Sequence, residues 1–78
     1  MKNYQVYGRR KIERHIRKKI YERDGYKCRK CGDTEWLTID HVIPLAKGGT
    51  NRENNLITLC KKCNQEKGTE ILHEFIRI

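Results

Sequence analysis

The sequence predicts a small α+β domain in which a basic helix precedes a compact core built around a four-cysteine knuckle. Three observations predict it: isoleucines spaced four apart in a basic N-terminal segment, two Cys-x2-Cys pairs, and two short β-type runs between those pairs. The chain has 78 residues, which suits a single domain. A core of that size rarely contributes more than about 3–5 kcal/mol net, so a further source of stability is expected.

A basic helix is expected over residues 9–24, after a flexible arm at residues 1–8. Its apolar stripe recurs at every fourth position while lysines and arginines cover the other faces, as in an amphipathic helix; the stripe consists of Ile12, Ile16 and Ile20. Asp24-Gly25 ends the helix, because glycine readily takes the left-handed conformation that often follows one. Residues 9–78 are therefore expected to form one domain.

The core, residues 28–68, is expected to contain the knuckle, a strand, a loop, a second strand and a helix. Apolar and polar residues alternate over residues 36–43, and a shorter β-type run covers residues 56–59. The loop between them, residues 45–55, is rich in glycine and asparagine, which favour turns. The remaining expected helices are residues 60–67 and an amphipathic helix over residues 69–78 with Thr69 as its N-cap.

The two cysteine pairs, Cys28-x2-Cys31 and Cys60-x2-Cys63, have the spacing of a zinc knuckle. Together they complete a tetrahedral shell with no open position, so one structural zinc ion is expected; two disulfides or four unrelated buried cysteines are the alternatives. No apolar run is typical of a secretory signal or approaches the roughly 20 residues of a membrane span. We therefore expect a cytoplasmic location, where cysteines stay reduced and bind metals.

The formal charge of +8 is concentrated in the N-terminal part of the chain. Residues 1–31 hold 12 basic and 3 acidic side chains, whereas residues 32–78 hold 6 basic and 7 acidic ones. Such a block suits nucleic acid or an anionic membrane surface, and a merely soluble charged face is the alternative. We interpret the basic helix as a clamp on nucleic-acid phosphates; the candidates for these contacts are Arg9, Arg10, Arg14, Arg17, Lys18 and, outside the helix, Lys67.

A second cluster of polar residues lies around the two expected strands; it consists of Asp40, His41, Asn54, Asn55 and Asn64. Histidine titrates near neutral pH and suits a general base, while a carboxylate with an amide oxygen suits Mg²⁺ or Mn²⁺. Adjacent strand residues point to opposite faces, so Asp40 and His41 share a site only if the strand ends or twists there. The alternative is a turn aspartate, a half-buried histidine and loop-forming asparagines.

These motifs resemble the HNH endonuclease family, in its zinc-bearing branch. The resemblance covers roughly residues 15–68 and rests on Cys28-x2-Cys31-Gly32, Ile39-Asp40-His41-Val42-Ile43-Pro44-Leu45, Gly48-Gly49, Asn55-Leu56 and Cys60-x2-Cys63-Asn64-x2-Lys67-Gly68. It implies the ββα-metal fold, or His-Me finger, in which two antiparallel strands and a helix hold one catalytic divalent cation.

The resemblance also implies roles for four residues. His41 would be the general base that activates water, and Asp40 and Asn64 would ligate a catalytic Mg²⁺ or Mn²⁺. Asn55 would brace the loop and orient His41; it is preferred to Asn54 because it directly precedes the strand leucine. Asn64 stands where the family name has its final histidine, so the pattern here is His-Asn-Asn.

The function that the resemblance implies is a metal-dependent endonuclease acting on DNA, in a bacterial, phage or mobile-element setting. We expect double-stranded DNA as the partner, no membrane, a monomer or weak dimer, and nicking with low sequence specificity. The alternatives are a non-catalytic zinc-ribbon module that binds nucleic acid and a partner-dependent subunit of a larger nuclease or packaging complex. Trp36 is interpreted as packing beside the zinc knuckle, with stacking on a base as the alternative.

Overall fold

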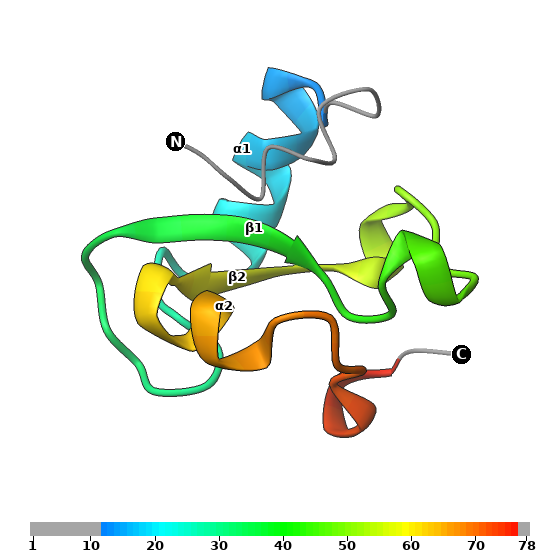
Figure 1. Ribbon diagram of the computed structural model, residues 1–78. Helices are drawn as coiled ribbons and strands as arrows, with labels where there is room; N and C mark the ends of the chain where they lie inside the picture. Colours follow the sequence, from blue (N-terminus) through cyan, green and yellow to red (C-terminus); the bar gives the residue numbers. More distant parts are fainter. Residues whose placement is uncertain (1–11, 77–78) are drawn as a thin grey trace.

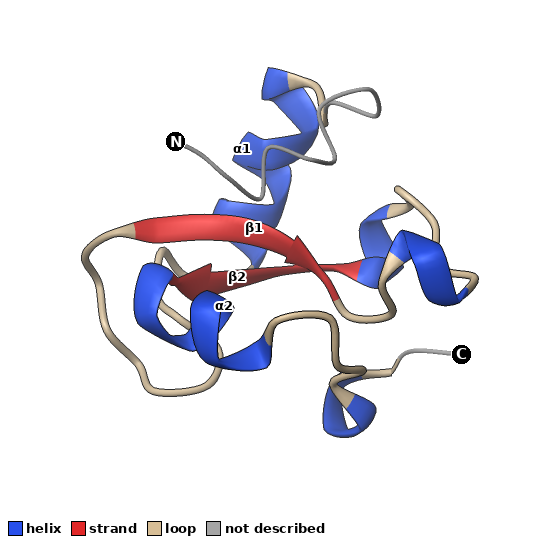
Figure 2. Cartoon of the chain, in the orientation of Figure 1, coloured by secondary structure: helices blue, strands red, loops and turns tan. Residues whose placement is uncertain are grey.

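Two antiparallel strands and two α-helices form the structure, a computed structural model that describes residues 12–76. They follow in the order α1 (Arg14–Arg23), β1 (Leu37–His41), β2 (Leu56–Cys60) and α2 (Lys61–Lys67). Figure 1 shows α1 and α2 on opposite sides of the two-stranded sheet, and Figure 2 shows the long irregular segments that flank β1. The predicted small α+β class is confirmed. Within the described part, no helix has both the length and the apolar character that a membrane span needs.

The register of the hairpin separates two ends of the molecule. Leu37 pairs with Cys60 at one end, and His41 pairs with Leu56 at the other. The cysteine end therefore lies four residues along β1 from the histidine end, where a loop with two 3-10 turns joins the strands; the turns are Leu45–Lys47 and Glu53–Asn55. Because α2 follows Cys60 without a linker, it packs back along the sheet toward the histidine end.

The apolar core is small and lies against the cysteine pairs. It joins side chains of β2, the end of β1 and the C-terminal segment; its buried members are Val42, Ile57, Leu59, Leu72, Cys28, Cys60 and Cys63. On α1, Ile20 is buried and Ile16 is half-buried, and Ile12, which precedes the helix, is also half-buried. Few large apolar side chains are therefore buried, as expected for a domain that needs a further source of stability.

A buried carboxylate, Asp24, fastens the end of α1 to the open edge of β2. Its Oδ2 atom accepts a hydrogen bond from the Thr58 amide (2.9 Å), and Arg23 and Arg29 donate to its oxygens at 2.8–3.1 Å. Arg23 also donates to the Leu56 carbonyl at 2.7 Å, so it serves the fold rather than the exposed basic face. Burial opposes ionisation of Asp24, but the hydrogen bonds and the charge of Arg23 outweigh it and lower the pKa of Asp24.

The first helix is shorter than the sequence predicts. Among the described residues it begins at Arg14, because Glu13 has an extended backbone (φ −65°, ψ 153°) and its carbonyl accepts the first helical hydrogen bonds. Residues 9–11 and the expected arm at residues 1–8 lie outside the described residues. At the other end the prediction holds, since the helix stops at Arg23 and Gly25 has a positive φ of 72°.

The helix predicted over residues 69–78 is wrong. In the described part of that segment only a 3-10 turn forms, at His73–Phe75, and Thr69 caps no helix. The Leu72 amide donates to the Val42 carbonyl at 3.0 Å, and the Leu72 side chain is buried in the core. This tertiary contact holds the chain against the end of β1 and overrides the helical spacing of the apolar residues.

Candidate functional site

The four cysteines form one compact cluster at the cysteine end of the hairpin. Their sulfur atoms all lie within 4.8 Å of one another, and those of Cys31 and Cys60 are 3.6 Å apart. Tetrahedral zinc with Zn–S bonds of about 2.3 Å would separate neighbouring sulfurs by about 3.8 Å, so the spacing fits a single ion. In each knuckle the second cysteine's amide points at the first cysteine's sulfur, at 3.5 Å in Cys28–Cys31 and 3.4 Å in Cys60–Cys63.

The acidities of these thiols differ because their surroundings differ. Burial raises the pKa of Cys28, but hydrogen bonds from the backbone, including the Cys31 amide, outweigh it and lower this pKa to about 6. Burial and the neighbouring thiols raise the pKa of Cys63. Two negative sulfurs so close together repel each other, and a bound cation removes that penalty. The cluster is thus positioned to bind a metal ion.

The second cluster lies where α2 packs on β1. Three polar residues at this interface are almost fully buried: Asp40 is 5% exposed, Asn64 is 7% exposed and Lys67 is 7% exposed. Asn64 lies beside Thr38, whose Oγ1 accepts a hydrogen bond from the Asn64 Nδ2 atom at 2.8 Å. One helical turn further on, Lys67 lies beside Asp40. The structure therefore brings two predicted metal ligands, Asp40 and Asn64, to the same strand–helix interface.

The Asp40 carboxylate has one satisfied and one unsatisfied oxygen. Oδ1 accepts a hydrogen bond from the His41 amide at 2.7 Å. Oδ2 is buried and has no hydrogen-bond donor among the described residues, although the Lys67 ammonium lies 3.4 Å away as an ion-pair partner. An unsatisfied buried carboxylate oxygen is costly, and an oxygen-preferring cation such as Mg²⁺ would satisfy it. This oxygen and the amide of Asn64 fit a hard divalent cation.

Lys67, a predicted phosphate contact, is buried between α2 and β1. Its side chain is 2% exposed, and its ammonium contacts Asp40 and, at 3.5 Å, the Gly68 carbonyl. Because Lys67 follows Asn64 by three residues, it shares the helix face that packs on β1. The phosphate contact expected of Lys67 stays a prediction, because no nucleic acid is present to test it.

His41 ends β1, and its ring turns toward the loop that joins the strands. The residue is 3% exposed, and its Nε2 atom lies 2.6 Å from Oδ1 of Asn51. Sequence reasoning missed Asn51, because an asparagine in a glycine-rich turn ten residues away looks like an ordinary loop former. Only the folded loop shows that its amide reaches the histidine.

Asn55 ties this loop together. Its Oδ1 atom accepts from the Ile43 amide (2.9 Å), and its Nδ2 atom donates to the carbonyls of Ile43 (3.0 Å) and Thr50 (2.8 Å). Asn54, the competing candidate, is exposed. Gly49 packs so closely that an added Cβ atom would lie 1.7 Å from the Ile43 carbonyl oxygen and 2.9 Å from Asn55 Nδ2. The loop that presents Asn51 is thus fixed by a buried amide and a glycine that no larger residue can replace.

The basic face of α1 carries three of the predicted phosphate-binding residues. The side chains of Arg14, Arg17 and Lys18 line a shallow hollow together with Tyr21 and Tyr26, whose stacked rings have centroids 5.9 Å apart. Arg9 and Arg10 lie outside the described residues. Exposed cations beside aromatic rings suit contact with a phosphate backbone.

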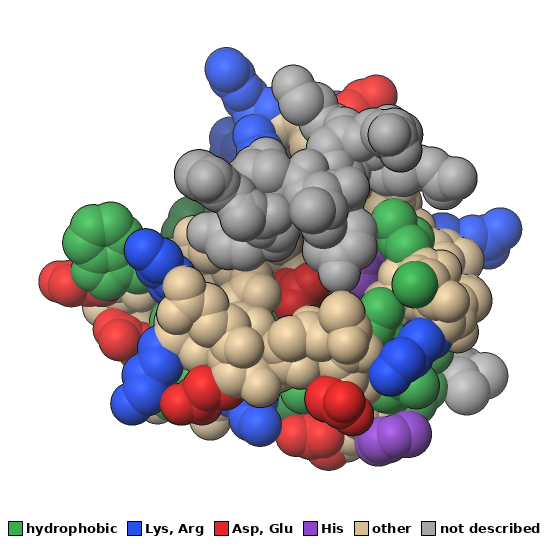
Figure 3. All heavy atoms as spheres, in the orientation of Figure 1, with side chains coloured by type: hydrophobic (Ala, Val, Ile, Leu, Met, Phe, Trp, Pro, Cys, Tyr) green, Lys and Arg blue, Asp and Glu red, His purple; other side chains and the backbone are tan. Residues whose placement is uncertain are grey.

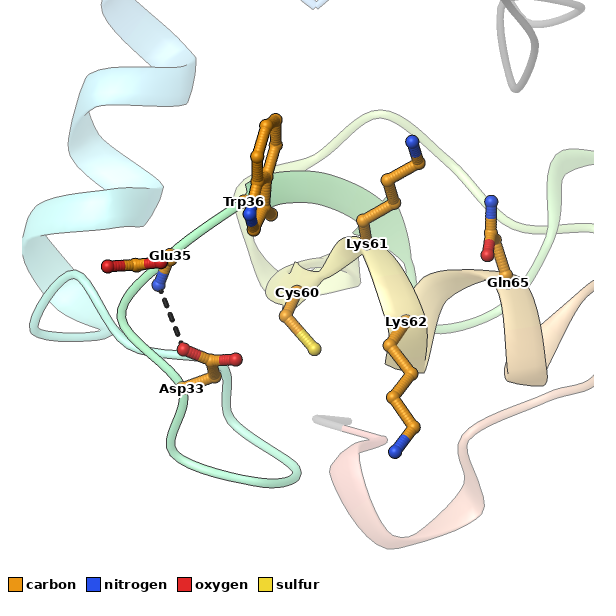
Figure 4. Close-up of a pocket in the computed structure, with 7 residues that line it drawn as sticks. All are labelled: Asp33, Glu35, Trp36, Cys60, Lys61, Lys62 and Gln65. Atoms are coloured by element: carbon orange, nitrogen blue, oxygen red, sulfur yellow. Dashed lines mark hydrogen bonds between the residues drawn. The ribbon is translucent and has the colours of Figure 1, made fainter.

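A second shallow pocket lies next to the cysteine cluster, and Figure 4 shows the side chains that line it. Its lining consists of Asp33, Glu35, Trp36, Cys60, Lys61, Lys62 and Gln65. Trp36 shares this pocket with Cys60 but keeps 76% of its surface exposed. The interpretation that Trp36 packs beside the knuckle is therefore wrong, because the indole faces solvent.

Comparisons with known proteins agree on one family. A family model described as HNH endonuclease matches residues 26–78. The CRISPR-associated endonuclease Cas9 of Corynebacterium diphtheriae is 37% identical over 51 residues, which are 60% of this chain and 5% of that protein. The CRISPR-associated endonuclease Cas9 of Actinomyces naeslundii is 36% identical over 56 residues, which are 67% of this chain and 5% of that protein. The chain thus matches only about one twentieth of the length of these curated relatives.

Proposed function

The chain belongs to the HNH endonuclease family, and on that premise we propose that it is a divalent-cation-dependent endonuclease domain that hydrolyses DNA phosphodiester bonds. The observation that carries the proposal is the buried Oδ2 atom of Asp40, which has the Lys67 ammonium as an ion-pair partner but accepts no hydrogen bond from the described residues. Buried polar atoms without a hydrogen bond are rare in folded proteins, and a missing ion is one explanation for such an atom. Phosphodiester hydrolysis needs a cation at that kind of ligand and a base nearby.

Asp40 and Asn64 would hold the catalytic cation, in a ββα-metal arrangement formed by β1, β2 and α2. Both offer oxygen ligands, which Mg²⁺ and Mn²⁺ prefer. Once bound, the cation stabilises the negative charge that develops on the phosphate and on the leaving oxygen. The hydrogen bond from Asn64 to Thr38 orients the amide, and the bond from the His41 amide orients the Asp40 carboxylate.

His41 would be the general base. In this proposal the contact between His41 Nε2 and the Asn51 amide oxygen, at 2.6 Å, fixes the orientation of the ring relative to the attacking water. Asn55 acts on His41 indirectly, because it fixes the loop that holds Asn51. In this proposal Asn55 and Asn51 are positioning residues, and His41 contacts the attacking water.

The four cysteines would hold one zinc ion with a structural role. A shell of four thiolates leaves no position for water or substrate, so this ion cannot serve the chemistry. We further propose that double-stranded DNA lies against the basic face of α1, whose exposed cations supply phosphate contacts rather than base readout. Low sequence specificity is expected because phosphate contacts carry no sequence information. Nicking is expected because one catalytic site acts on one strand at a time.

The test is conversion of supercoiled plasmid to open circles by zinc-loaded protein, with Mg²⁺, with Mn²⁺ or with neither. We expect cation-dependent nicking by the wild type and by His73→Ala, which replaces an exposed histidine outside the site. His41→Ala should lose at least a hundredfold in rate, since general-base catalysis typically contributes about 10²–10⁴-fold. Equal nicking by both variants would refute the assigned base.

The same assay separates the two alternatives. Plasmid that is bound at low salt but never cut would favour a non-catalytic nucleic-acid-binding module. The chain matches only 5% of the length of its relatives, so a larger assembly is the other alternative to test. Activity that appears only with an added partner would favour a subunit of a larger nuclease or packaging complex.

A further inference from the structure

Trp36 is held outside the fold by its backbone. It is the more exposed of two large hydrophobic side chains that stand out among the described residues, and its φ of 55° lies in the left-handed region that non-glycine residues rarely adopt. Its carbonyl accepts a hydrogen bond from the Lys61 amide at 2.7 Å, which ties the residue to the start of α2. Strained backbone of this kind persists only where the surrounding structure enforces it, and it concentrates at functional positions.

The surroundings of Trp36 are polar: two lysines and an amide line the pocket, together with the carboxylates of Asp33 and Glu35. In Figure 4, Trp36, Lys61 and Gln65 project to the same side of the pocket, whereas Lys62 projects to the opposite side. The Asp33 carboxylate accepts a hydrogen bond from the Glu35 amide at 3.1 Å and so belongs to its own turn. Figure 3 shows Lys and Arg side chains and Asp and Glu side chains close together along the left edge of this face.

This composition distinguishes two kinds of ligand. A protein-docking patch is a contiguous apolar area of several hundred Å². One aromatic face beside lysines and an amide is instead the usual make-up of a site for unpaired nucleotides, in which the base stacks on the ring and the phosphate meets the cation. The pocket volume, about 330 Å³, accommodates a group of that size.

We propose that this pocket, the Trp36 pocket, binds one unpaired nucleobase of single-stranded nucleic acid, with the base stacked on Trp36 and Lys61 on an adjoining phosphate. This proposal takes nucleic acid as the class of ligand from the proposed function, and it does not depend on cleavage. Along the extended strand, Trp36 lies roughly 17 Å from His41. That distance corresponds to about five nucleotide steps of 3.4 Å, so one strand can reach both the pocket and the histidine end.

The test uses the intrinsic fluorescence of Trp36, which is the single tryptophan of the chain. Zinc-loaded His41→Ala protein is titrated with a short oligothymidine in a buffer without Mg²⁺ or Mn²⁺, so that binding is measured and nothing is cut. Because a stacked base quenches the indole, we expect saturable quenching. An abasic oligonucleotide of the same length and charge should quench far less.

Variants then separate stacking from charge, with affinity measured by the anisotropy of a labelled oligothymidine. Trp36→Ala should weaken binding about tenfold, which corresponds to about 1.4 kcal/mol, whereas Trp36→Phe should retain most of the affinity. Lys61→Ala should weaken binding more than Lys30→Ala, a matched loss of one exposed lysine outside the pocket.

Three outcomes would overturn the proposal. Saturated anisotropy without any change in fluorescence, or equal affinities for wild type and Trp36→Ala, would leave protein docking as the use of the exposed indole. Equal quenching by the abasic oligonucleotide would replace base stacking by phosphate contact. Plasmid nicking by Trp36→Ala in Mg²⁺ is a separate readout, so the nuclease proposal and the nucleobase site can fail independently.

Discussion

Lys67 places a positive charge beside the carboxylate that would hold the catalytic cation. Its ammonium lies 3.4 Å from Asp40 Oδ2, and both side chains are almost fully buried. Without a partner, a buried carboxylate would be strongly destabilising. In the absence of the cation the lysine therefore balances the charge of Asp40, although Oδ2 accepts no hydrogen bond from the described residues, and the same charge opposes the cation's entry.

Lys67→Met tests this competition. In the absence of Mn²⁺ the variant should be destabilised by roughly 3 kcal/mol, because it leaves the Asp40 charge buried and unpaired. Added Mn²⁺ should then raise the Tm of Lys67→Met more than that of the wild type, since no ammonium competes for the carboxylate. Thermal unfolding over a MnCl2 series measures this, with Lys62→Met as the control on the exposed face of α2. An identical Mn²⁺ dependence in all three proteins would exclude competition.

At the scale of the helices and strands, the Asp24 carboxylate that joins α1 to β2 makes the stability of the fold depend on pH. The hydrogen bonds and the charge of Arg23 lower the pKa of Asp24 in the folded chain against the opposing effect of burial. A lowered folded pKa gives stability that is fully present above the unfolded pKa of about 3.9 and is lost as the pH falls through the folded value.

Asp24→Asn should therefore lower the free energy of unfolding at pH 7, by an amount on the order of 2 kcal/mol. The gap between variant and wild type should stay constant from pH 7 to about pH 5 and shrink as the pH falls through about 3.9 toward the lower pKa of the folded state. Urea unfolding across this range measures the gap, and the cysteine cluster affects both proteins alike. A gap that widens toward low pH would contradict the lowered pKa.

Local patterns were sufficient for the elements whose stability is local. The Cys-x2-Cys spacing, the alternation before Pro44 and the Asp24-Gly25 stop signal predicted the knuckle, β1 and the end of α1. Three features depend on contacts distant in sequence, and no local pattern encodes them: the extended segment at Leu72, the inward side chain of Lys67, and the contact from Asn51 to His41.

In the molecule as a whole, the two ends of the β1–β2 hairpin carry different clusters of residues. The cysteine end holds the cluster that is positioned to bind a metal ion, and the histidine end presents the polar cluster. Because α2 joins the two, beginning directly after Cys60 and carrying Asn64 and Lys67, the metal that holds the knuckle would also fix the position of the proposed catalytic residues.

Removal of the structural metal should therefore unfold the domain. Structural zinc sites in small domains contribute apparent free energies of about 10–16 kcal/mol at neutral pH, which exceeds what this core can supply. Circular dichroism during titration with a zinc-specific chelator should show loss of helix in step with loss of zinc, and added zinc should restore it. Full helix content in protein shown by metal analysis to be zinc-free would refute the structural role.

The most direct test of the catalytic centre is the binding of Mn²⁺ to zinc-loaded protein, followed by electron paramagnetic resonance. Wild type and Glu70→Gln, which removes an exposed acidic group, should bind a single Mn²⁺ per chain with similar affinity, and Asp40→Asn should lose that site while keeping its zinc and its fold. Retention of the site in Asp40→Asn, or its absence from the wild type, would contradict the account of Asp40 as the ligand of a catalytic cation.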